Sequence, residues 1–245
     1  MKTTLLYLDI QKEITSLFSD MDYYSPLPSE RELSQMFNVS RPTIRKALEN
    51  LEHDNMILRI QGKGAFYIGN KVSINHSNSE NHGLGLFSIL TSAGKITKNH
   101  VLQQIIEEPT PDISTYLNLK KGDLIFHLKR LRYVNDALYS LDDDYIPLHI
   151  CPNLIDTDFT DHSLFETFKE NNIIPSKEDK NIEFRRSDLQ ESAYLKLKKR
   201  HPVSVTRILS YDNDERIIQY GTSIADAYKS RFQIVSTINP PHNDD

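Results

Sequence analysis

The stretch that decides the N-terminal fold is Leu27–Ile68, which reads LPSERELSQMFNVSRPTIRKALENLEHDNMILRIQGKGAFYI. Ser29 can cap a helix whose third residue, Glu32, reaches back to the cap. That short helix would end near Phe37 and bury Leu33, Met36 and Phe37. After a turn, Ser40 can cap another helix with a three- and four-residue apolar spacing, carried by Ile44, Ala47, Leu48 and Leu51. We therefore expect two short helices joined at a tight turn.

The flanking residues extend this pattern on both sides. Before it, a first helix is predicted from the spacing of Tyr7, Ile10, Ile14 and Leu17. After it, the β-prone runs 56–60 and 65–68 are separated by Gln61, Gly62, Lys63 and Gly64, which predicts a hairpin with a basic tip. Helix, helix, turn, helix and hairpin in this order indicate a winged helix-turn-helix in residues 1–70.

Basic residues occupy the positions where such a fold meets DNA. Arg41 and Arg45 lie one turn apart at the start of the third helix, with Thr43 and Lys46 close by. Guanidinium groups there can read guanine edges in the major groove or hold phosphates. Arg31 is placed to grip the DNA backbone, and Lys63 can approach the minor groove. A net charge of −5 gives no support to this, and a basic helix face is more often plain solvated surface. The combination of caps, arginine pair and basic hairpin nevertheless favours DNA binding.

The stretch Leu27–Ile68 resembles the DNA-binding domain of the GntR family of bacterial regulators almost throughout. The resemblance implies a dimer bound to double-stranded operator DNA with an inverted repeat. It also implies that the DNA contacts are Arg31, Ser40, Arg41, Thr43, Arg45, Gly62, Lys63 and Gly64.

The length of 245 residues is enough for two domains. Asn70–Gly83, reading NKVSINHSNSENHG, has almost nothing to bury and is interpreted as a linker at 71–82. A second domain would then occupy 83–240, with a tail at 241–245. No apolar run is long enough for a membrane span, so a cytoplasmic protein is expected. The single cysteine, Cys151, excludes an internal disulfide and is expected to be buried.

The second domain is predicted to be α+β with a largely antiparallel sheet, because short turns join many of its strands. The expected strands are 98–107, 124–134, 138–146, 182–186, 203–211, 217–225 and 232–238, and the expected helices are 114–119, 163–171 and 189–198.

An arginine pair lies on one of these strands. In LIFHLKRLRYV, residues two apart share a face, so Arg130 and Arg132 continue an apolar face made of Leu124, Phe126 and Leu128. A bound phosphate or acid would satisfy these charges through bidentate hydrogen bonds. Cross-strand pairing with Asp142 and Asp144 is an equally open interpretation from the residues alone.

From about Gly83 to Asn239 the chain resembles the UTRA ligand-binding domain of the HutC branch of GntR regulators. The resemblance is carried by KRLRYVNDALYSLDDDYIP, CPNL, SLFETFKENNI and IIQYGTSIADAYKSRFQIV. It implies a chorismate lyase-like fold that binds a phosphorylated sugar. The residues that it places in the pocket are Phe87, Ser88, Arg130, Arg132, Asp142, Ser163, Phe165, Gln219 and Tyr220.

The identity of the effector is less sharply indicated. Many members carry a tyrosine where this chain has Phe165 and a glutamate where it has Gln219, and the family's Asp-Gly turn is Asp136-Ala137. The segments SLDDDYI and IIQY, with the later SRF at 230–232, resemble trehalose operon repressors, which implies trehalose 6-phosphate. Other sugar phosphates, such as N-acetylglucosamine 6-phosphate, and amino-acid derivatives are the alternatives.

Two other classes of function compete with a ligand-controlled repressor. A chorismate lyase-like enzyme could use Arg130, Arg132 and Asp142, but the chain has no GxSxG, HExxH, Walker or dinucleotide-binding motif. The histidines lack the spacing of metal ligands, so neither catalysis nor a cofactor or metal is expected. A constitutive DNA-binding protein with a purely dimerising second domain would share every N-terminal feature.

Overall fold

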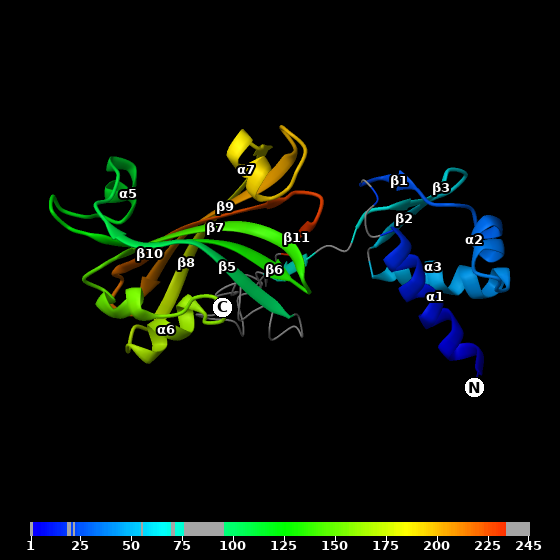
Figure 1. Cartoon of the computed structure of the whole chain (residues 1–245), viewed down its shortest axis with the longest axis horizontal. Coiled ribbons are helices and arrows are strands. Elements are labelled where there is room, and N and C mark those ends of the chain that lie inside the picture. The colour runs from blue at the N-terminus through cyan, green and yellow to red at the C-terminus, as the bar shows by residue number, and fades with distance from the viewer. Residues whose placement is uncertain are drawn as a thin grey trace, which may run out of the picture. The chain divides into compact units, whose positions relative to one another are not determined.

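The computed structural model describes residues 2–18, 21, 23–54, 56–69, 72–75 and 96–233. The chain divides into two compact units, residues 1–72 and 73–245, and each is described by itself. Figure 1 shows both units with their elements labelled. Phe87 and Ser88, and most of the predicted linker, lie outside the described residues.

The first unit has the element order of a winged helix-turn-helix. Its helices are α1 (Lys2–Phe18), α2 (Glu30–Met36) and α3 (Arg41–His53), and its strands are β1 (Ser25–Pro26), β2 (Ile57–Ile60) and β3 (Gly64–Tyr67). The strands form an antiparallel sheet in the order β1-β3-β2. The predicted fold class is confirmed, although the short strand β1 was not predicted.

The core of the first unit follows the predicted apolar spacing with two corrections. In α3, Ile44, Ala47, Leu48 and Leu51 are all buried, as predicted. In α1, Leu17 is 54% exposed and Phe18 takes its place in the core. In α2, Met36 is 55% exposed because α2 is too short for a second buried turn. These helices pack mainly through Ile10, Ile14, Phe18, Leu33 and the α3 residues.

The second unit is built on a six-stranded antiparallel sheet with the strand order β5-β6-β7-β10-β9-β8. A separate pair joins β4 (Val72–Asn75) to β11 (Ser230–Gln233). The bounds of the large sheet are β5 (Thr97–Glu107), β6 (Ile125–Val134), β7 (Ala137–Pro147), β8 (Pro175–Arg186), β9 (Pro202–Asp212) and β10 (Ile217–Asp226). The predicted α+β class with a mainly antiparallel sheet is confirmed.

Two strand predictions need correction. Leu124 lies just before β6 and is 39% exposed, so it does not extend the buried face. Strand β8 begins at Pro175, seven residues before the predicted start, because its charged first half is an edge of the sheet and needs no apolar side chains.

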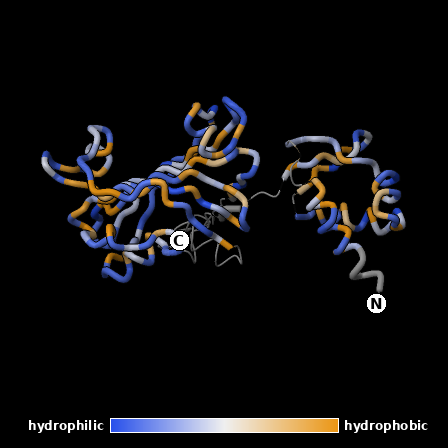
Figure 2. Tube along the Cα trace, in the orientation of Figure 1, coloured by the Kyte–Doolittle hydropathy of each residue, from blue (hydrophilic) through white to orange (hydrophobic). Residues whose placement is uncertain are grey.

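Helices cover both faces of the sheet, and Figure 1 shows α6 on one side with α5 and α7 on the other. We call the side of α6 (Leu164–Glu170) and of the 3-10 helix η1 (Pro152–Asp156) the first face; there Phe126 and Leu128 pack with Phe168. The second face packs against α5 (Pro111–Tyr116) and the segment around α7 (Leu189–Tyr194). Figure 2 shows hydrophobic residues recurring along the strands between these layers. Cys151 is buried in the first-face core, as expected.

Candidate functional site

The start of α3 presents basic side chains to solvent. Ser40 caps the helix, and its hydroxyl accepts a bond from the Thr43 amide. Arg41, Arg45 and Lys46 are exposed, whereas Thr43 is only 9% exposed and its hydroxyl lies 2.8 Å from that of Ser40. Thr43 therefore belongs to the cap rather than to the exposed basic surface.

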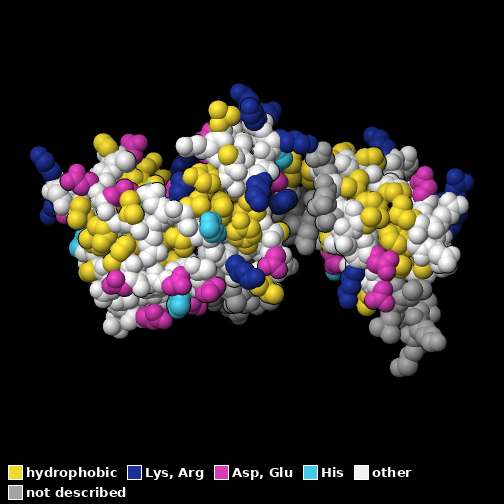
Figure 3. Space-filling view, viewed as in Figure 1, with side chains coloured by type: hydrophobic (Ala, Val, Ile, Leu, Met, Phe, Trp, Pro, Cys, Tyr) yellow, Lys and Arg dark blue, Asp and Glu magenta, His cyan; other side chains and the backbone are white. Residues whose placement is uncertain are grey.

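Helix α2 supplies a further exposed cation in this unit. Ser29 and Glu32 form the predicted reciprocal capping box, which fixes the start of α2. Arg31 is the second residue of α2 and is exposed. Figure 3 shows the mixture of basic and acidic side chains on one face of this unit.

The hairpin tip is shaped by two glycines. Gly62 has a φ of +76° and Gly64 a φ of +99°, backbone conformations that side chains with a Cβ rarely adopt. Between them, Lys63 is exposed, and its amide donates to the carbonyl of Ile60 over 3.0 Å. The wing thus offers one cation flanked by bare backbone.

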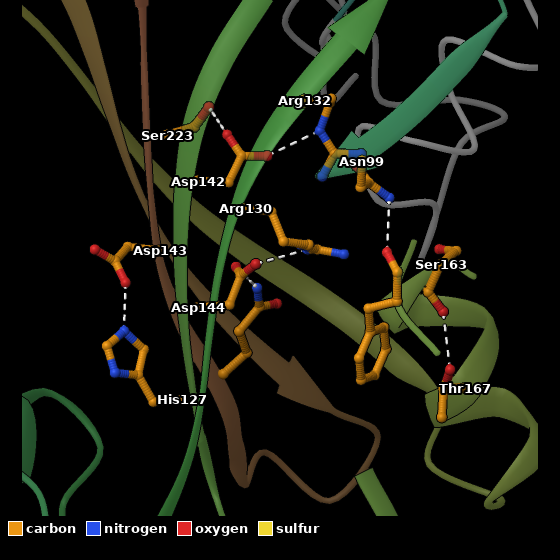
Figure 4. A network of polar contacts seen from close by, with 12 residues as sticks. Asn99, His127, Arg130, Arg132, Asp142, Asp143, Asp144, Ser163, Thr167 and Ser223 are labelled. Atoms are coloured by element: carbon orange, nitrogen blue, oxygen red, sulfur yellow. Dashed lines mark hydrogen bonds and ion pairs between the residues drawn. The ribbon is translucent and has the colours of Figure 1, made fainter. Parts of the chain in front are cut away.

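In the second unit, the arginine pair is buried and paired with the two expected aspartates (Figure 4). Arg130 Nη2 donates to Asp144 Oδ2 over 2.7 Å, and Arg132 Nε donates to Asp142 Oδ2 over 2.8 Å. The register places Arg130 opposite Asp142, so its bond to Asp144 runs diagonally to a residue two positions along β7. The cross-strand ion pairs, one of the two sequence interpretations, are therefore present.

Further polar side chains from β9 and β10 complete a buried layer on the first face. Ser223 Oγ donates to Asp142 over 2.7 Å, and Gln219 Nε2 donates to Asp144 over 2.6 Å. Ser210 Oγ donates in turn to Gln219 Oε1 over 3.1 Å. Gly221 makes room for this arrangement, because a Cβ there would lie 2.8 Å from Asp144 Oδ1.

The buried charges perturb one another. Burial lowers the pKa of Arg130 because it disfavours the charged guanidinium. Burial raises the pKa of Asp144 for the same reason, although the positive charge of Arg130 acts in the opposite direction. Burial also acts to raise the pKa of Asp142, but the positive charges of Arg132 and Arg130 outweigh it and the net shift is downward. Asp142 is therefore held as a carboxylate by the two guanidinium groups beside it.

Some buried side-chain atoms near this layer lack a hydrogen-bond partner among the described residues. Arg130 Nε is buried without an acceptor, and Asn99 Oδ1 is buried without a donor. The amide nitrogen of Asn99 donates to the carbonyl of Phe159 over 3.1 Å. The Arg130 guanidinium lies 5.8 Å from the centre of the Phe159 ring. A buried donor without an acceptor is costly, so this is a place where an anionic ligand could add a bond.

The remaining predicted effector residues lie on different faces of the sheet. Ser163, 2% exposed, precedes α6 and makes no side-chain capping bond, and Figure 4 shows it on the α6 side of Arg130. Phe165 is buried in α6 and packs against Phe168. Tyr220 instead packs with the second-face core and stacks on Tyr116, so the structure does not group it with Arg130. Neighbouring residues on a strand point to opposite faces, so Gln219 and Tyr220 could not both line one pocket.

Several polar residues were not among the sequence predictions. Glu30 contacts Arg45 and Arg59, and Ser210 and Ser223 extend the buried layer. Strand alternation could have placed Ser223 on the same face as Gln219, but nothing local in the sequence indicates the partners of Glu30.

The comparisons with known proteins agree with this architecture. The family model described as "Bacterial regulatory proteins, gntR family" matches residues 20–66, and the UTRA domain model matches residues 92–230, more than half of the chain. This chain is a GntR-family regulator with a UTRA domain. It is thus a DNA-binding transcription regulator and not an enzyme.

Relatives of this GntR regulator include the HTH-type transcriptional regulator GgaR of Escherichia coli K12, which is 28% identical over 83% of this chain and 79% of its own length. A probable fructoselysine utilization operon transcriptional repressor from the same strain is 27% identical over 86% of each chain. The crystal structure of PhnF from Mycobacterium smegmatis shares the fold, with a TM-score of 0.69 at 20% identity over 94% of this chain and 100% of its own.

The UTRA regulator shows neither a membrane helix nor a metal cluster in its described part. No helix there is long and apolar enough to cross a bilayer. Likewise, no group of three or more potential His, Cys, Asp or Glu ligands gathers among the residues that are described.

Proposed function

We propose that this regulator is a cytoplasmic, homodimeric repressor whose grip on an inverted-repeat operator is controlled by a phosphorylated sugar. Trehalose 6-phosphate is the first candidate for the effector. N-acetylglucosamine 6-phosphate, other sugar phosphates and amino-acid derivatives are the alternatives. We retain residues 1–70 as the proposed DNA-binding domain, 71–82 as the linker, 83–240 as the effector domain and 241–245 as the tail.

The observation that carries the effector proposal is the buried Nε of Arg130, which has no acceptor among the described residues. It belongs to a guanidinium whose side chain is only 4% exposed, and which Asp144 satisfies at one terminal nitrogen. A phosphate oxygen at Nε would add a charge-assisted hydrogen bond in a region of low dielectric constant. The proposed phosphate contacts are Arg130, Arg132 and Ser163, with Phe87 and Ser88 retained from the family resemblance.

The neighbouring polar side chains can form hydrogen bonds with the hydroxyl groups of a sugar. Asp142 and Asp144 are acceptors that can receive bonds from hydroxyl groups, and Gln219 offers both a donor and an acceptor. Phe165 lies next to the start of α6 and could contact the apolar side of a sugar ring. The relative named for fructoselysine utilisation supports a ligand derived from a sugar.

The proposed DNA contacts follow from exposure and charge. Arg41, Arg45 and Lys46 would enter the major groove from α3, with the capped start of α3, Ser40 and Thr43, fixing their backbone. Arg31 would hold the flanking phosphates, and Gly62, Lys63 and Gly64 would bring the wing to the minor groove.

Effector and operator would be linked through the population of conformers. A sugar phosphate that favours a dimer with a different spacing of its recognition helices would release DNA, and DNA would weaken effector binding to the same extent. The recognition helices of a dimer must match successive major grooves, so a change in spacing is sufficient for release.

The test is an operator-binding titration by fluorescence anisotropy, with an operator selected from random DNA by the wild-type protein. Trehalose 6-phosphate should weaken binding, whereas trehalose and inorganic phosphate at equal concentration should not. Arg130→Lys should lose the response while retaining operator affinity. Lys129→Gln is the matched control, since Lys129 lies on the same strand and contacts Asp143 on the other face.

Three results would separate the alternatives. A response to a different sugar phosphate would replace the candidate ligand and keep the proposal. No response to any phosphorylated sugar, together with no shift of the melting temperature, would favour a purely dimerising domain. An equal loss of response in both variants would contradict the role of Arg130.

A further inference from the structure

Glu30 joins three elements of the DNA-binding unit through two arginines. It is the first residue of α2, and its Oε2 accepts a bond from Arg45 Nη2 of α3 over 3.0 Å. Arg45 Nε approaches Oε1 at 3.4 Å, and Arg59 Nη2 of β2 donates to the same oxygen over 3.0 Å. One carboxylate therefore fixes the direction of Arg45 relative to both its neighbouring helix and the sheet.

The bonds to Glu30 leave one edge of the Arg45 guanidinium group unused by Glu30. A guanidinium has two edges that can each make a pair of parallel hydrogen bonds: the Nε–Nη2 edge and the Nη1–Nη2 edge. Glu30 takes the first edge. The second edge, with the two hydrogens of Nη1, is not used by Glu30, and the Arg45 side chain is 58% exposed. That second edge matches the two acceptors that guanine presents in the major groove.

We propose that Glu30 is a positioning residue that sets DNA specificity by holding Arg45 in the orientation for a base edge and by disfavouring its capture by phosphate. The inference rests on the proposed DNA contact of Arg45. Glu30 itself is not expected to touch a base.

Electrostatics support the second half of this role. The hydrogen bond from Arg45, with the charges of Arg45, Arg59 and Arg41, lowers the pKa of Glu30, so its carboxylate is ionised at neutral pH. A fixed negative charge beside the recognition helix repels DNA phosphates at every sequence. Only a complex that gains base contacts through Arg45 offsets that repulsion, so the carboxylate penalises non-specific complexes more than specific ones.

Two glutamates allow a matched test. Glu30→Gln removes the charge and keeps the size of the side chain. Glu49→Gln removes one carboxylate from α3, where Glu49 forms an exposed pair with Lys46 at 3.6 Å. The charge of Glu49 also acts on Arg45, so this control removes a nearby charge without removing the bonds that Glu30 accepts from Arg45. Both variants are compared with the full-length wild-type protein by selection from a random DNA library, and then by affinity for the selected operator and for a scrambled duplex.

The expected result is a divergence of the two affinities. Glu30→Gln should bind scrambled DNA more tightly and the operator more weakly, which reduces their affinity ratio about tenfold, the value of one bidentate base contact. It should also lose one guanine preference per half-site, while Glu49→Gln keeps the wild-type preference. An unchanged or increased ratio in Glu30→Gln, or an equal fall in both variants, would overturn the inference. If the wild-type protein selected no sequence at all, the proposed operator function itself would fail.

Discussion

Arg130 and Asp144 form an ion pair of 2.7 Å in which the side chains are only 4% and 10% exposed. The pair lies between strands β6 and β7 and shares its acid with Gln219 from β10. The charges that are proposed to receive a ligand are therefore already engaged in the free protein. Under the proposed function, a phosphate would bond the Nε of Arg130 while Asp144 keeps Nη2, so the ligand and Asp144 would share one guanidinium group.

Breaking this pair from one side should be strongly destabilising. Arg130→Ala leaves the buried Asp144 without its cation, so we expect a loss of about 3–5 kcal/mol in the free energy of unfolding. Urea unfolding, followed through the transition of the second unit, measures this loss of free energy. The double variant Arg130→Met with Asp144→Asn should recover a large part of that loss, and equal instability of the two variants would contradict the pairing energetics.

Gly221 should be intolerant of a side chain. Gly221→Ala places a Cβ 2.8 Å from Asp144 Oδ1 and 3.1 Å from Gln219 Nε2, so both groups must move. We expect a loss of stability of about 1–3 kcal/mol and a weaker effector response, because the Asp144 contact to Arg130 shifts. Thermal unfolding and the operator titration measure the two effects. Thr222→Ala, on the other face, should leave the effector response unchanged.

Stability should depend on pH through His127 on the second face. Its ring stacks on Tyr145, and Nδ1 lies 2.7 Å from Glu107 Oε1. Nε2 bonds Asp143, as Figure 4 shows. Burial acts to lower the pKa of His127, but Asp143 and Glu107 together outweigh it and raise the pKa above 6.5. Because the folded pKa is the higher one, the stabilisation is complete below the unfolded value and is lost as pH rises through the folded value.

The measurement compares the wild-type protein with His127→Gln in urea unfolding between about pH 6 and pH 9, where the histidine contribution should vanish at the alkaline end. The difference in unfolding free energy should be largest at the acidic end and shrink as pH rises. A difference that is constant with pH would show that the imidazolium does not contribute.

The wing lysine should contribute to affinity rather than to sequence preference. Lys63→Gln is expected to weaken binding to operator and scrambled DNA by similar factors, since phosphate contacts carry no base information. The slope of log affinity against log salt should fall by about 0.9, the value of one phosphate contact. Anisotropy titrations at several salt concentrations measure the slope. Lys120→Gln, in an exposed turn of the second unit, serves as the control and should leave it unchanged.

The sequence alone determined the features that depend on residues only a few positions apart in the chain. The Ser29–Glu32 box, the Ser40 cap, the buried stripe of α3 and the glycines of the wing are local, and each appeared as predicted. Strand alternation likewise placed Arg130 and Arg132 on one face, because side chains two apart on a strand share a side.

Only the tertiary structure decided which distant groups meet. The bond between Gln219 and Asp144 spans 75 residues, the diagonal choice of Asp144 by Arg130 depends on strand register, and Glu30 meets Arg45 and Arg59 only when three elements pack together. Strand alternation separates Gln219 from Tyr220, but the packing decided that Gln219 is the one that shares the face of Asp144. These contacts form only when distant elements pack together, so they depend on the free energy of the whole domain. A polar group in the interior bonds the partner that the folded backbone places within reach.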